Sequence, residues 1–464
     1  MYEDASFIVE VGWTMNAKLD KKFIKHVLLL ALPVIIQQLL VNLLSIADTV
    51  MIGGLGEDAI SSITVANKFF FVFNLAIFGL ANGIGIYISQ YYGANNKHSY
   101  NAVFRFGLWC CTLVGIVATI YLLLFPESVI TIFLETPKIV EGALEYLYVV
   151  RYSYLPFACV MMIAVAYRIK GEPKVPMVSG FIAFVVNVVL NYILIFGHFG
   201  FEAMGIKGAA IATSLSRYVE LFFLLWLLSN KKSDLYLFAK IKKLNIKEKV
   251  IIIKQTIPLV CNEILWSIGL SIIFMNYCYV GESYIPSLTV VDNISSLVHV
   301  AFAGCATATG IIIGKDLGAN HLDEARSDSK KMIKIGLIIY VVGSVLIMIG
   351  SPFIPQLFSL KETSADMAMI LLIVKAAIMW TQGYAETAYY ILRAGGDTKS
   401  VLAIDGLFII FGPLLLSILA SRVWHMDLLM MFILVEGINI VKVFLSTYFY
   451  KKEHWIKNLT LIKE

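Results

Sequence analysis

The chain has too few charged residues, relative to its hydrophobic residues, for a surface exposed to water. Only 15% of its 464 residues are charged, 59% are hydrophobic, and the mean hydropathy is +0.81. Soluble proteins have about 25% charged residues, so the composition excludes an ordinary soluble domain. At roughly 20–23 apolar residues per membrane span, this length predicts an all-α polytopic membrane protein with about twelve transmembrane helices.

Motifs for metal, redox and nucleotide chemistry are also lacking. The six cysteines lie in apolar runs without C-x-x-C spacing, and the sequence has no P-loop, H-E-x-x-H motif or G-x-S-x-G elbow. We therefore expect no cofactor and no enzyme activity, and the lack of a nucleotide site favours a secondary carrier. Residues 1–22 have no apolar core of secretory-signal length, and MNAKLDKK from Met15 predicts an alternative start to Met1.

Twelve apolar runs are separated by charged or Gly/Pro-containing stretches. We expect spans near 26–50, 60–90, 102–125, 141–166, 175–197, 206–228, 251–279, 286–314, 333–357, 366–391, 400–420 and 428–449. Most of the 37 Lys and Arg residues then fall on one side, and the other side has Lys138, Lys207, Lys361 and Arg422. Because positive loops stay inside, both termini are expected in the cytoplasm of a cell inner (plasma) membrane. The basic excess orients the chain, and no nucleic-acid partner is expected.

The two halves of the chain repeat with one constant separation. Pro33 and Pro258 are as far apart in the sequence as Gly85 and Gly310 are, and as Gly93-Ala94-Asn95 and Gly318-Ala319-Asn320 are. Six spans per half give both halves the same orientation, which is a parallel repeat. We expect two six-helix bundles at 26–228 and 251–450, with a cytoplasmic N-terminal segment 1–25, a cytoplasmic linker 229–250 and a cytoplasmic tail 451–464. Such repeats favour a carrier that works by alternating access; a duplicated scaffold without transport is the alternative.

Several motifs resemble the multidrug and toxin compound extrusion (MATE) family from about Lys25 to Tyr450. They are LALPVIIQQLLVNLLSIADTVMIGGLG in the first span, SQYYGANN after the second, YRIKGEPKVPM after the fourth, GIKGAAIATSLS in the sixth and LRAGGDTK after the tenth. The resemblance implies an antiporter that exports organic, cationic and lipophilic compounds in exchange for Na⁺ or H⁺. We expect a monomer in the lipid bilayer with small-molecule partners. A lipid-linked saccharide or lipid flippase and an intramembrane lipid-modifying enzyme are the alternatives, and the sequence identifies neither substrate nor coupling ion.

Charged side chains inside a membrane are costly and mark functional sites by default. Asp48 matches the first-span aspartate that binds a proton or Na⁺ in family members; capping the end of its helix is the structural alternative. Asn187 and Asn191 lie four residues apart on one helix face and match a family pair whose second member is aspartate, which leaves one carboxylate fewer here. Thr213 offers a further oxygen. A Na⁺ site is expected at Asp48, Asn187, Asn191 and Thr213, or at Glu263.

Glu263 lies near the membrane centre, five residues after Pro258, and matches a family glutamate used for cation coupling and drug binding. A salt bridge with Lys68 or Lys375 is its structural alternative. Gln382 stands where family members have an aspartate, so Glu386, one turn later, or Asp292 is expected to replace it in the substrate cavity. Glu386 could instead pair with Lys399 or Arg393. Nearby Trp and Tyr residues suit organic cations, although such residues are also common at membrane interfaces.

Overall fold

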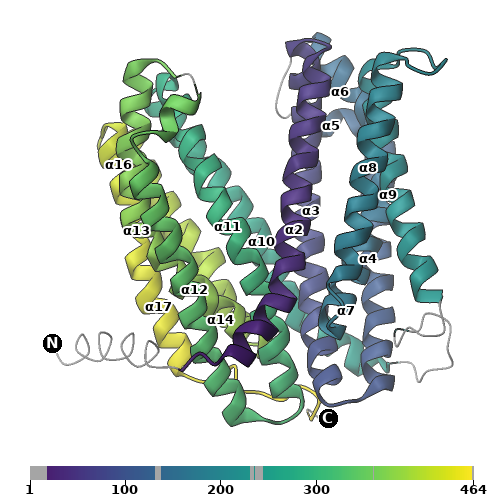
Figure 1. Ribbon diagram of the computed structural model, residues 1–464, viewed down its shortest axis with the longest axis vertical. Helices are drawn as coiled ribbons and strands as arrows, with labels where there is room; N and C mark the ends of the chain where they lie inside the picture. The colour runs from purple at the N-terminus through teal and green to yellow at the C-terminus, as the bar shows by residue number, and fades with distance from the viewer. Residues whose placement is uncertain (1–17, 131–136, 230–234, 236–243, 359, 462–464) are drawn as a thin grey trace. The chain divides into compact units, whose positions relative to one another are not determined.

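The computed structural model describes residues 18–130, 137–229, 235, 244–358 and 360–461. Within these residues every regular element is helical (Figure 1). Twelve of these helices are long and apolar enough to cross a membrane. The expected all-α fold and the number of spans are confirmed. Met15 and most of the expected linker lie outside the described residues.

The first six spans alternate with short connections. Their elements are α2 (Lys21–Gly53), α3 (Glu57–Gly93), α4 (Lys97–Leu124), the continuous series α6 (Pro137–Val150), η1 (Arg151–Ser153) and α7 (Tyr154–Lys170), α8 (Lys174–Phe196) and α9 (Gly205–Ser229). A short helix, α5 (Pro126–Ile130), follows α4. Gly171 and Gly197 end α7 and α8 in the left-handed conformation, which glycine adopts at little cost.

The last six spans are equally regular, with one exception near the end. Their elements are α10 (Ile246–Val280), η2 (Glu282–Tyr284), α11 (Ile285–Gly318), α12 (Leu322–Gly350), η3 (Ile354–Phe358), α13 (Glu362–Ala394), α14 (Thr398–Leu402), η4 (Ala403–Leu407), η5 (Ile410–Leu414), α15 (Leu415–Ile418), η6 (Leu419–Val423), α16 (Leu428–Gly437) and α17 (Asn439–Lys451). The eleventh span, Thr398–Val423, contains three π-helical segments. Such segments are rare and often lie at functional sites.

The ninth span begins earlier than the hydropathy predicts. We expected 333–357, whereas α12 covers Leu322–Gly350. Its polar first turns are helical because charges three residues apart pair along the helix: Arg326 with Asp323 at 2.9 Å and Lys331 with Asp328 at 2.7 Å. The expected bounds were therefore wrong, because the helix extends beyond the apolar run.

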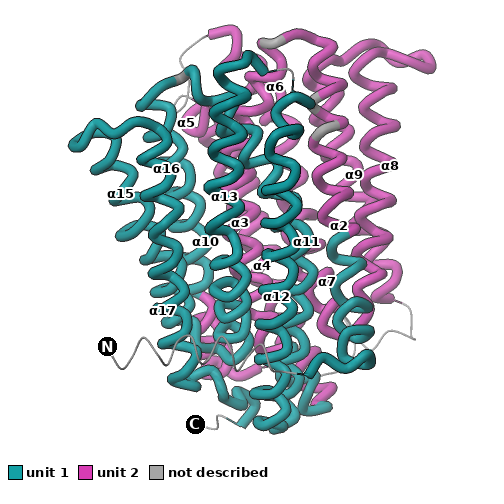
Figure 2. Tube along the Cα trace, turned by 60° about the vertical axis from the view of Figure 1, so that its left-hand side comes forward, with its two compact units in different colours: residues 1–35, 89–95, 257–464 teal, residues 36–88, 96–256 magenta. Residues whose placement is uncertain are grey.

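The chain divides into two compact units (Figure 2). Unit 1 comprises residues 1–35, 89–95 and 257–464, and unit 2 comprises residues 36–88 and 96–256. Each has a core of fully buried side chains, such as Phe104 and Tyr154 in unit 2 and Tyr340 and Met379 in unit 1. The division into bundles at 26–228 and 251–450 stays a prediction.

The sequence repeat is also visible in the packing inside each unit. In unit 2 the Ser62 hydroxyl donates to the carbonyl of Ile139 at 3.0 Å, and in unit 1 the Ser287 hydroxyl donates to the carbonyl of Ser364 at 2.7 Å. Ser287 and Ser364 are the positions of the repeat that are equivalent to Ser62 and Ile139. The same side chain therefore joins the same two spans in each half.

The chain after α17 packs against unit 1. Trp455 is 1% exposed and stacks on Tyr450, with ring centroids 5.8 Å apart. The backbone N–H of Leu459 donates to Gln90 Oε1 at 2.6 Å, and the Asn458 amide donates to the carbonyl of Gly318 at 3.2 Å. Much of the expected tail 451–464 is thus a fixed part of the fold.

Candidate functional site

Unit 2 contains a polar cluster around Asp48. The Asn191 amide on α8 donates to Asp48 Oδ1 on α2 at 2.5 Å and to Asn187 Oδ1 at 2.9 Å, and the Asn187 amide donates to Thr213 Oγ1 on α9 at 3.3 Å. The four-residue spacing places both asparagines on one face of α8, and both are fully buried. The structure therefore brings together all four residues of the expected ion site in this half. Asp48 lies inside α2 and does not cap its end.

The side-chain oxygen of Asn191 has no hydrogen-bond partner within the described residues. This atom, Oδ1, is buried, and a buried amide oxygen normally accepts a hydrogen bond. A carboxylate, two amide oxygens and a hydroxyl are the oxygen donors that hard cations prefer. The described residues contain no group of three or more His, Cys, Asp or Glu side chains suited to a metal ion. A cation here would therefore meet one carboxylate and neutral oxygens.

Unit 2 also has a buried ion pair beside α8. Glu220, 2% exposed, pairs with Arg217 at 2.9 Å, and the Ser179 hydroxyl donates to the same carboxylate at 3.5 Å. Arg168 at the end of α7 donates to Gln37 Oε1 at 2.6 Å. The Arg217–Glu220 pair is neutral overall, whereas Asp48 has no Lys, Arg or His in ion-pair contact among the described residues.

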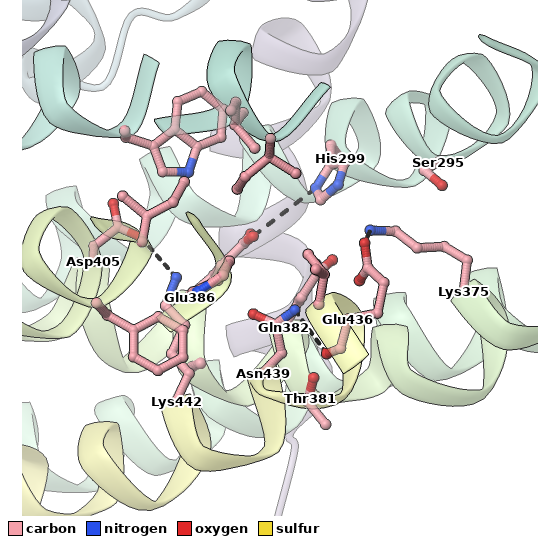
Figure 3. A pocket seen from close by; sticks show the side chains of 18 of the residues that line it. Ser295, His299, Lys375, Thr381, Gln382, Glu386, Asp405, Glu436, Asn439 and Lys442 are labelled. Carbon is pink, nitrogen blue, oxygen red and sulfur yellow. Dashed lines mark hydrogen bonds and ion pairs between the residues drawn. The ribbon is translucent and has the colours of Figure 1, made fainter. Parts of the chain in front are cut away.

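Unit 1 contains a pocket of about 600 Å³ (Figure 3), within the range of small-molecule sites. Residues of α10, α11, α13, the eleventh span, α16 and α17 line it. All four residues expected in the substrate cavity lie on its wall, namely Glu263, Asp292, Gln382 and Glu386. The wall also carries Asp405, Glu436, Lys375, Lys442 and His299, and the aromatic side chains of Trp266, Tyr277, Tyr389 and Tyr390.

Glu263 on α10 is paired with Arg393 on α13. Arg393 donates to Glu263 Oε1 at 3.0 Å, and the Tyr389 hydroxyl lies 3.3 Å from the same oxygen. The two side chains of the ion pair are 11% and 5% exposed. The expected alternative partners, Lys68 and Lys375, were wrong, because the helix that lies against Glu263 presents Arg393 at this level.

A second ion pair forms at the π-helical part of the eleventh span. Lys442 donates to Asp405 Oδ1 at 2.7 Å, and the Asn262 amide donates to Asp405 Oδ2 at 3.0 Å. Asn262 Oδ1 accepts the backbone N–H of Gly406 at 2.7 Å. The irregular helix thus frees a backbone donor for a side chain of α10, and this contact fixes Asp405 at the pocket wall.

Two carboxylates of the pocket have no Lys or Arg in ion-pair contact among the described residues: Glu386 and Asp292. The Tyr340 hydroxyl donates to Glu386 Oε2 at 2.5 Å, and His299 Nδ1 lies 4.0 Å from Glu386 Oε1. The expected alternative partners of Glu386, Lys399 and Arg393, were therefore wrong. Three of the five pocket carboxylates pair with Lys or Arg, and the other two have no such partner among the described residues, so acidic side chains outnumber Lys and Arg on the pocket wall.

Sequence reasoning did not identify three polar members of this region. His299, Tyr340 and Asn262 each bond to the expected residues or to their partners. Asn262 could have been noticed as the neighbour of Glu263, and His299 as a histidine inside an apolar span, whereas nothing in the sequence distinguishes Tyr340 from other tyrosines. Gln382 Oε1 is buried without a hydrogen-bond partner among the described residues.

The polar groups are distributed differently between the two halves of the repeat. The positions equivalent to Glu263, Asp292, Glu386 and Asp405 in the first half are Gln38, Asn67, Met161 and Gly180. Conversely, the positions equivalent to Asp48, Asn187 and Asn191 in the second half are Ile273, Gly412 and Leu416. Each half has therefore acquired its own polar site on a shared scaffold.

Comparisons with known proteins agree with this duplicated architecture. The MatE family model matches residues 33–193 and 258–418, two ranges that begin and end at equivalent positions of the repeat. The chain is 25% identical over 391 residues to the probable multidrug resistance protein YoeA of Bacillus subtilis, covering 82% of this chain and 80% of that protein. It is 27% identical over 382 residues to the probable multidrug resistance protein NorM of Haemophilus ducreyi, covering 80% and 81%.

Solved structures show the same fold. A crystal structure of MATE in complex with MaL6 superposes with a TM-score of 0.85 at 19% sequence identity, covering 93% of this chain and 96% of that one. The resemblance predicted from the motifs is therefore confirmed, and the expectation of a transporter in place of an enzyme is confirmed by the family. Because the family model covers more than half of its length, the chain belongs to the MATE family of transporters and is a multi-pass membrane protein.

Proposed function

We propose that the chain is a cation-coupled multidrug exporter that moves organic, mainly cationic and lipophilic compounds out of the cell in exchange for Na⁺ or H⁺. The acidic excess of the pocket in unit 1 carries this proposal. Among the described residues, Glu386 and Asp292 have no Lys or Arg partner, and aromatic rings of Trp266 and Tyr390 lie on the same wall. Aromatic faces and carboxylates together attract organic cations.

The coupling ion is proposed to bind at Asp48 in unit 2. The carboxylate already accepts one short hydrogen bond from Asn191, whose own side-chain oxygen has no hydrogen-bond partner in the described part of the chain. A proton on Asp48 would donate to an acceptor, and a Na⁺ ion would use both oxygens. Either event changes the hydrogen bonding between α2 and α8, which is a physical route from ion binding to helix movement.

Both termini are proposed to lie in the cytoplasm of the inner (plasma) membrane, with the two halves alternating between openings to each side. This proposal rests on the excess of Lys and Arg in the loops of one side and on the parallel repeat. The names of the multidrug resistance relatives support the substrate class. No cofactor is required by this scheme.

The test is efflux of a fluorescent organic cation from proteoliposomes that contain the purified protein, with Na⁺ and pH gradients imposed separately. The variants are Glu386→Gln, Glu263→Gln and Asp48→Asn, and the control is Glu141→Gln, which changes an exposed carboxylate. We expect gradient-driven efflux by wild type and control. We expect its loss in Glu386→Gln, Glu263→Gln and Asp48→Asn. Wild-type protein that shows no efflux under either gradient would contradict the proposal.

A further inference from the structure

One wall of the unit 1 pocket contains an ion pair between two different helices. Lys375 Nζ on α13 donates to Glu436 Oε1 on α16 at 2.7 Å. The two side chains are 13% and 14% exposed, and both line the pocket. Figure 3 shows the ammonium group of Lys375 directed at the Glu436 carboxylate. An alkylammonium group is thus already bound inside the pocket, and it belongs to the protein itself.

The repeat shows that the fold does not require this lysine. The position equivalent to Lys375 in the first half is Val150, and the position equivalent to Asp292 is Asn67. Arg393, by contrast, has a basic equivalent, Arg168, which also bonds to a side chain of the proline-containing helix of its half. Arg393 therefore belongs to the shared scaffold, whereas Lys375 is specific to the half that contains the pocket.

We propose that Glu436 and Asp292 form a subsite for a primary ammonium group, which the side chain of Lys375 occupies in the present state. A lysine ammonium is a flexible, strongly hydrated point charge with three donors, so a substrate that carries a primary amine can offer Glu436 the same hydrogen bond. The inference deepens the proposed function and rests on it: Lys375 competes with the substrate and sets the selectivity for amines.

Exchange of the Lys375 ammonium for a substrate ammonium at Glu436 is electrostatically reasonable, because no buried charge loses its partner. Removing a partner from a buried carboxylate is strongly unfavourable, but an incoming ammonium replaces the one that leaves. The displaced Lys375 has a second carboxylate available, since Asp292 lines the same pocket as Lys375 and Glu436. Asp292 has no ion pair of its own among the described residues. The subsite therefore favours amines that donate hydrogen bonds over quaternary ammonium ions, which cannot.

The test is chemical rescue of Lys375→Ala in purified protein. This variant lacks three methylene groups and the ammonium, which is the size of n-propylammonium. We expect n-propylammonium to raise the lowered Tm saturably, and tetramethylammonium at equal ionic strength to have no such effect. The double variant Lys375→Ala/Glu436→Ala should show no rescue, and neither should Lys138→Ala, which removes an exposed lysine.

A second variant covers the case in which Lys375→Ala does not fold with or without amine. Lys375→Gln keeps a hydrogen-bonding side chain and removes the competing charge, so it should bind a fluorescent primary amine at least tenfold more tightly than wild type. Equal or weaker binding by Lys375→Gln would overturn the proposal. Equal rescue of Lys375→Ala by propylammonium and tetramethylammonium, or rescue that persists in the double variant, would overturn it as well.

These measurements separate the subsite from the proposed function, because neither requires an ion gradient. If wild-type protein exports cations and the rescue fails, the subsite proposal alone is wrong. If the rescue succeeds and wild-type protein shows no efflux under either gradient, the amine subsite stands and the exporter proposal is wrong.

Discussion

Gly93 at the end of α3 and Gly318 at the end of α11 each lie against the backbone of the other helix. A methyl group at Gly93 would overlap the carbonyl oxygen of Lys315, and one at Gly318 would overlap the carbonyl oxygen of Gln90. The two glycines are equivalent positions of the repeat, as are the two carbonyl groups, and all four lie in unit 1. The ends of α3 and α11 therefore meet around a local two-fold axis where only glycine leaves room for backbone contact.

Gly318→Ala is expected to destabilise this contact. The added methyl group forces the two helix ends apart, and overpacking of this kind typically costs about 1–3 kcal/mol. The matched control is Gly310→Ala in the same helix, where an added methyl group meets no heavy atom within 4 Å; there alanine should be neutral or stabilising, by about 0.5–1 kcal/mol. Thermal unfolding of both purified variants checks this, and equal Tm values would contradict it.

Apolar runs and the internal repeat were sufficient to predict twelve helical spans, because both are patterns of the sequence itself and require no knowledge of tertiary contacts. The Asp48 cluster could also be expected, since a four-residue spacing fixes one face of α8 and the family resemblance supplied the partner helix. The partner of Glu263 could not be predicted, because the rotation of α13 against α10 decides which side chain faces Glu263, and this rotation depends on side-chain packing. The π-helical segments of the eleventh span and the early start of α12 likewise depend on contacts that hydropathy does not report.

Arg393→Met is expected to destabilise the protein more than Arg393→Met/Glu263→Leu. The single variant leaves a carboxylate buried without its base, and breaking a buried pair costs about 3–5 kcal/mol, whereas replacing both partners with apolar groups is often neutral. Thermal unfolding of the two variants and wild type measures this difference.

Asp58→Asn is the control for the Arg393 variants, since Asp58 pairs with Lys138 at the surface and exposed pairs contribute little. Its Tm should equal that of wild type. If Arg393→Met/Glu263→Leu is as unstable as Arg393→Met, the two side chains are needed for more than their charge–charge interaction.

Asn191→Ala is expected to uncouple ion binding from substrate binding. The variant removes the amide that donates to Asp48 and an amide oxygen that has no partner among the described residues, and Asn191 does not line the pocket of unit 1. Ion-driven efflux should fall at least tenfold, and equilibrium binding of a fluorescent organic cation should stay within twofold of wild type. Asn82→Ala is the control, because the Asn82 amide donates to a carbonyl of its own helix. Equal ion-driven efflux by Asn191→Ala and Asn82→Ala would remove Asn191 from the coupling site.

Trp455→Ala is expected to loosen the segment that follows α17. The indole is 1% exposed, its Nε1 donates to the carbonyl of Tyr450 at 3.2 Å, and its own backbone lies against Gly395 at the end of α13. Truncation of a buried tryptophan typically costs about 3–5 kcal/mol.

If the segment separates, Gln90 loses the N–H of Leu459 and is left with a buried, unpaired oxygen at the crossing of α3 and α11. Loss of Trp455 should therefore lower the Tm and also make the bonds after Lys451 and Lys452 accessible to trypsin. The matched control is Trp226→Ala, the same change at a side chain that is 65% exposed, which should alter neither property. If Trp455→Ala has the same Tm and the same resistance to trypsin as wild type, the terminal segment covers the helix ends without stabilising them.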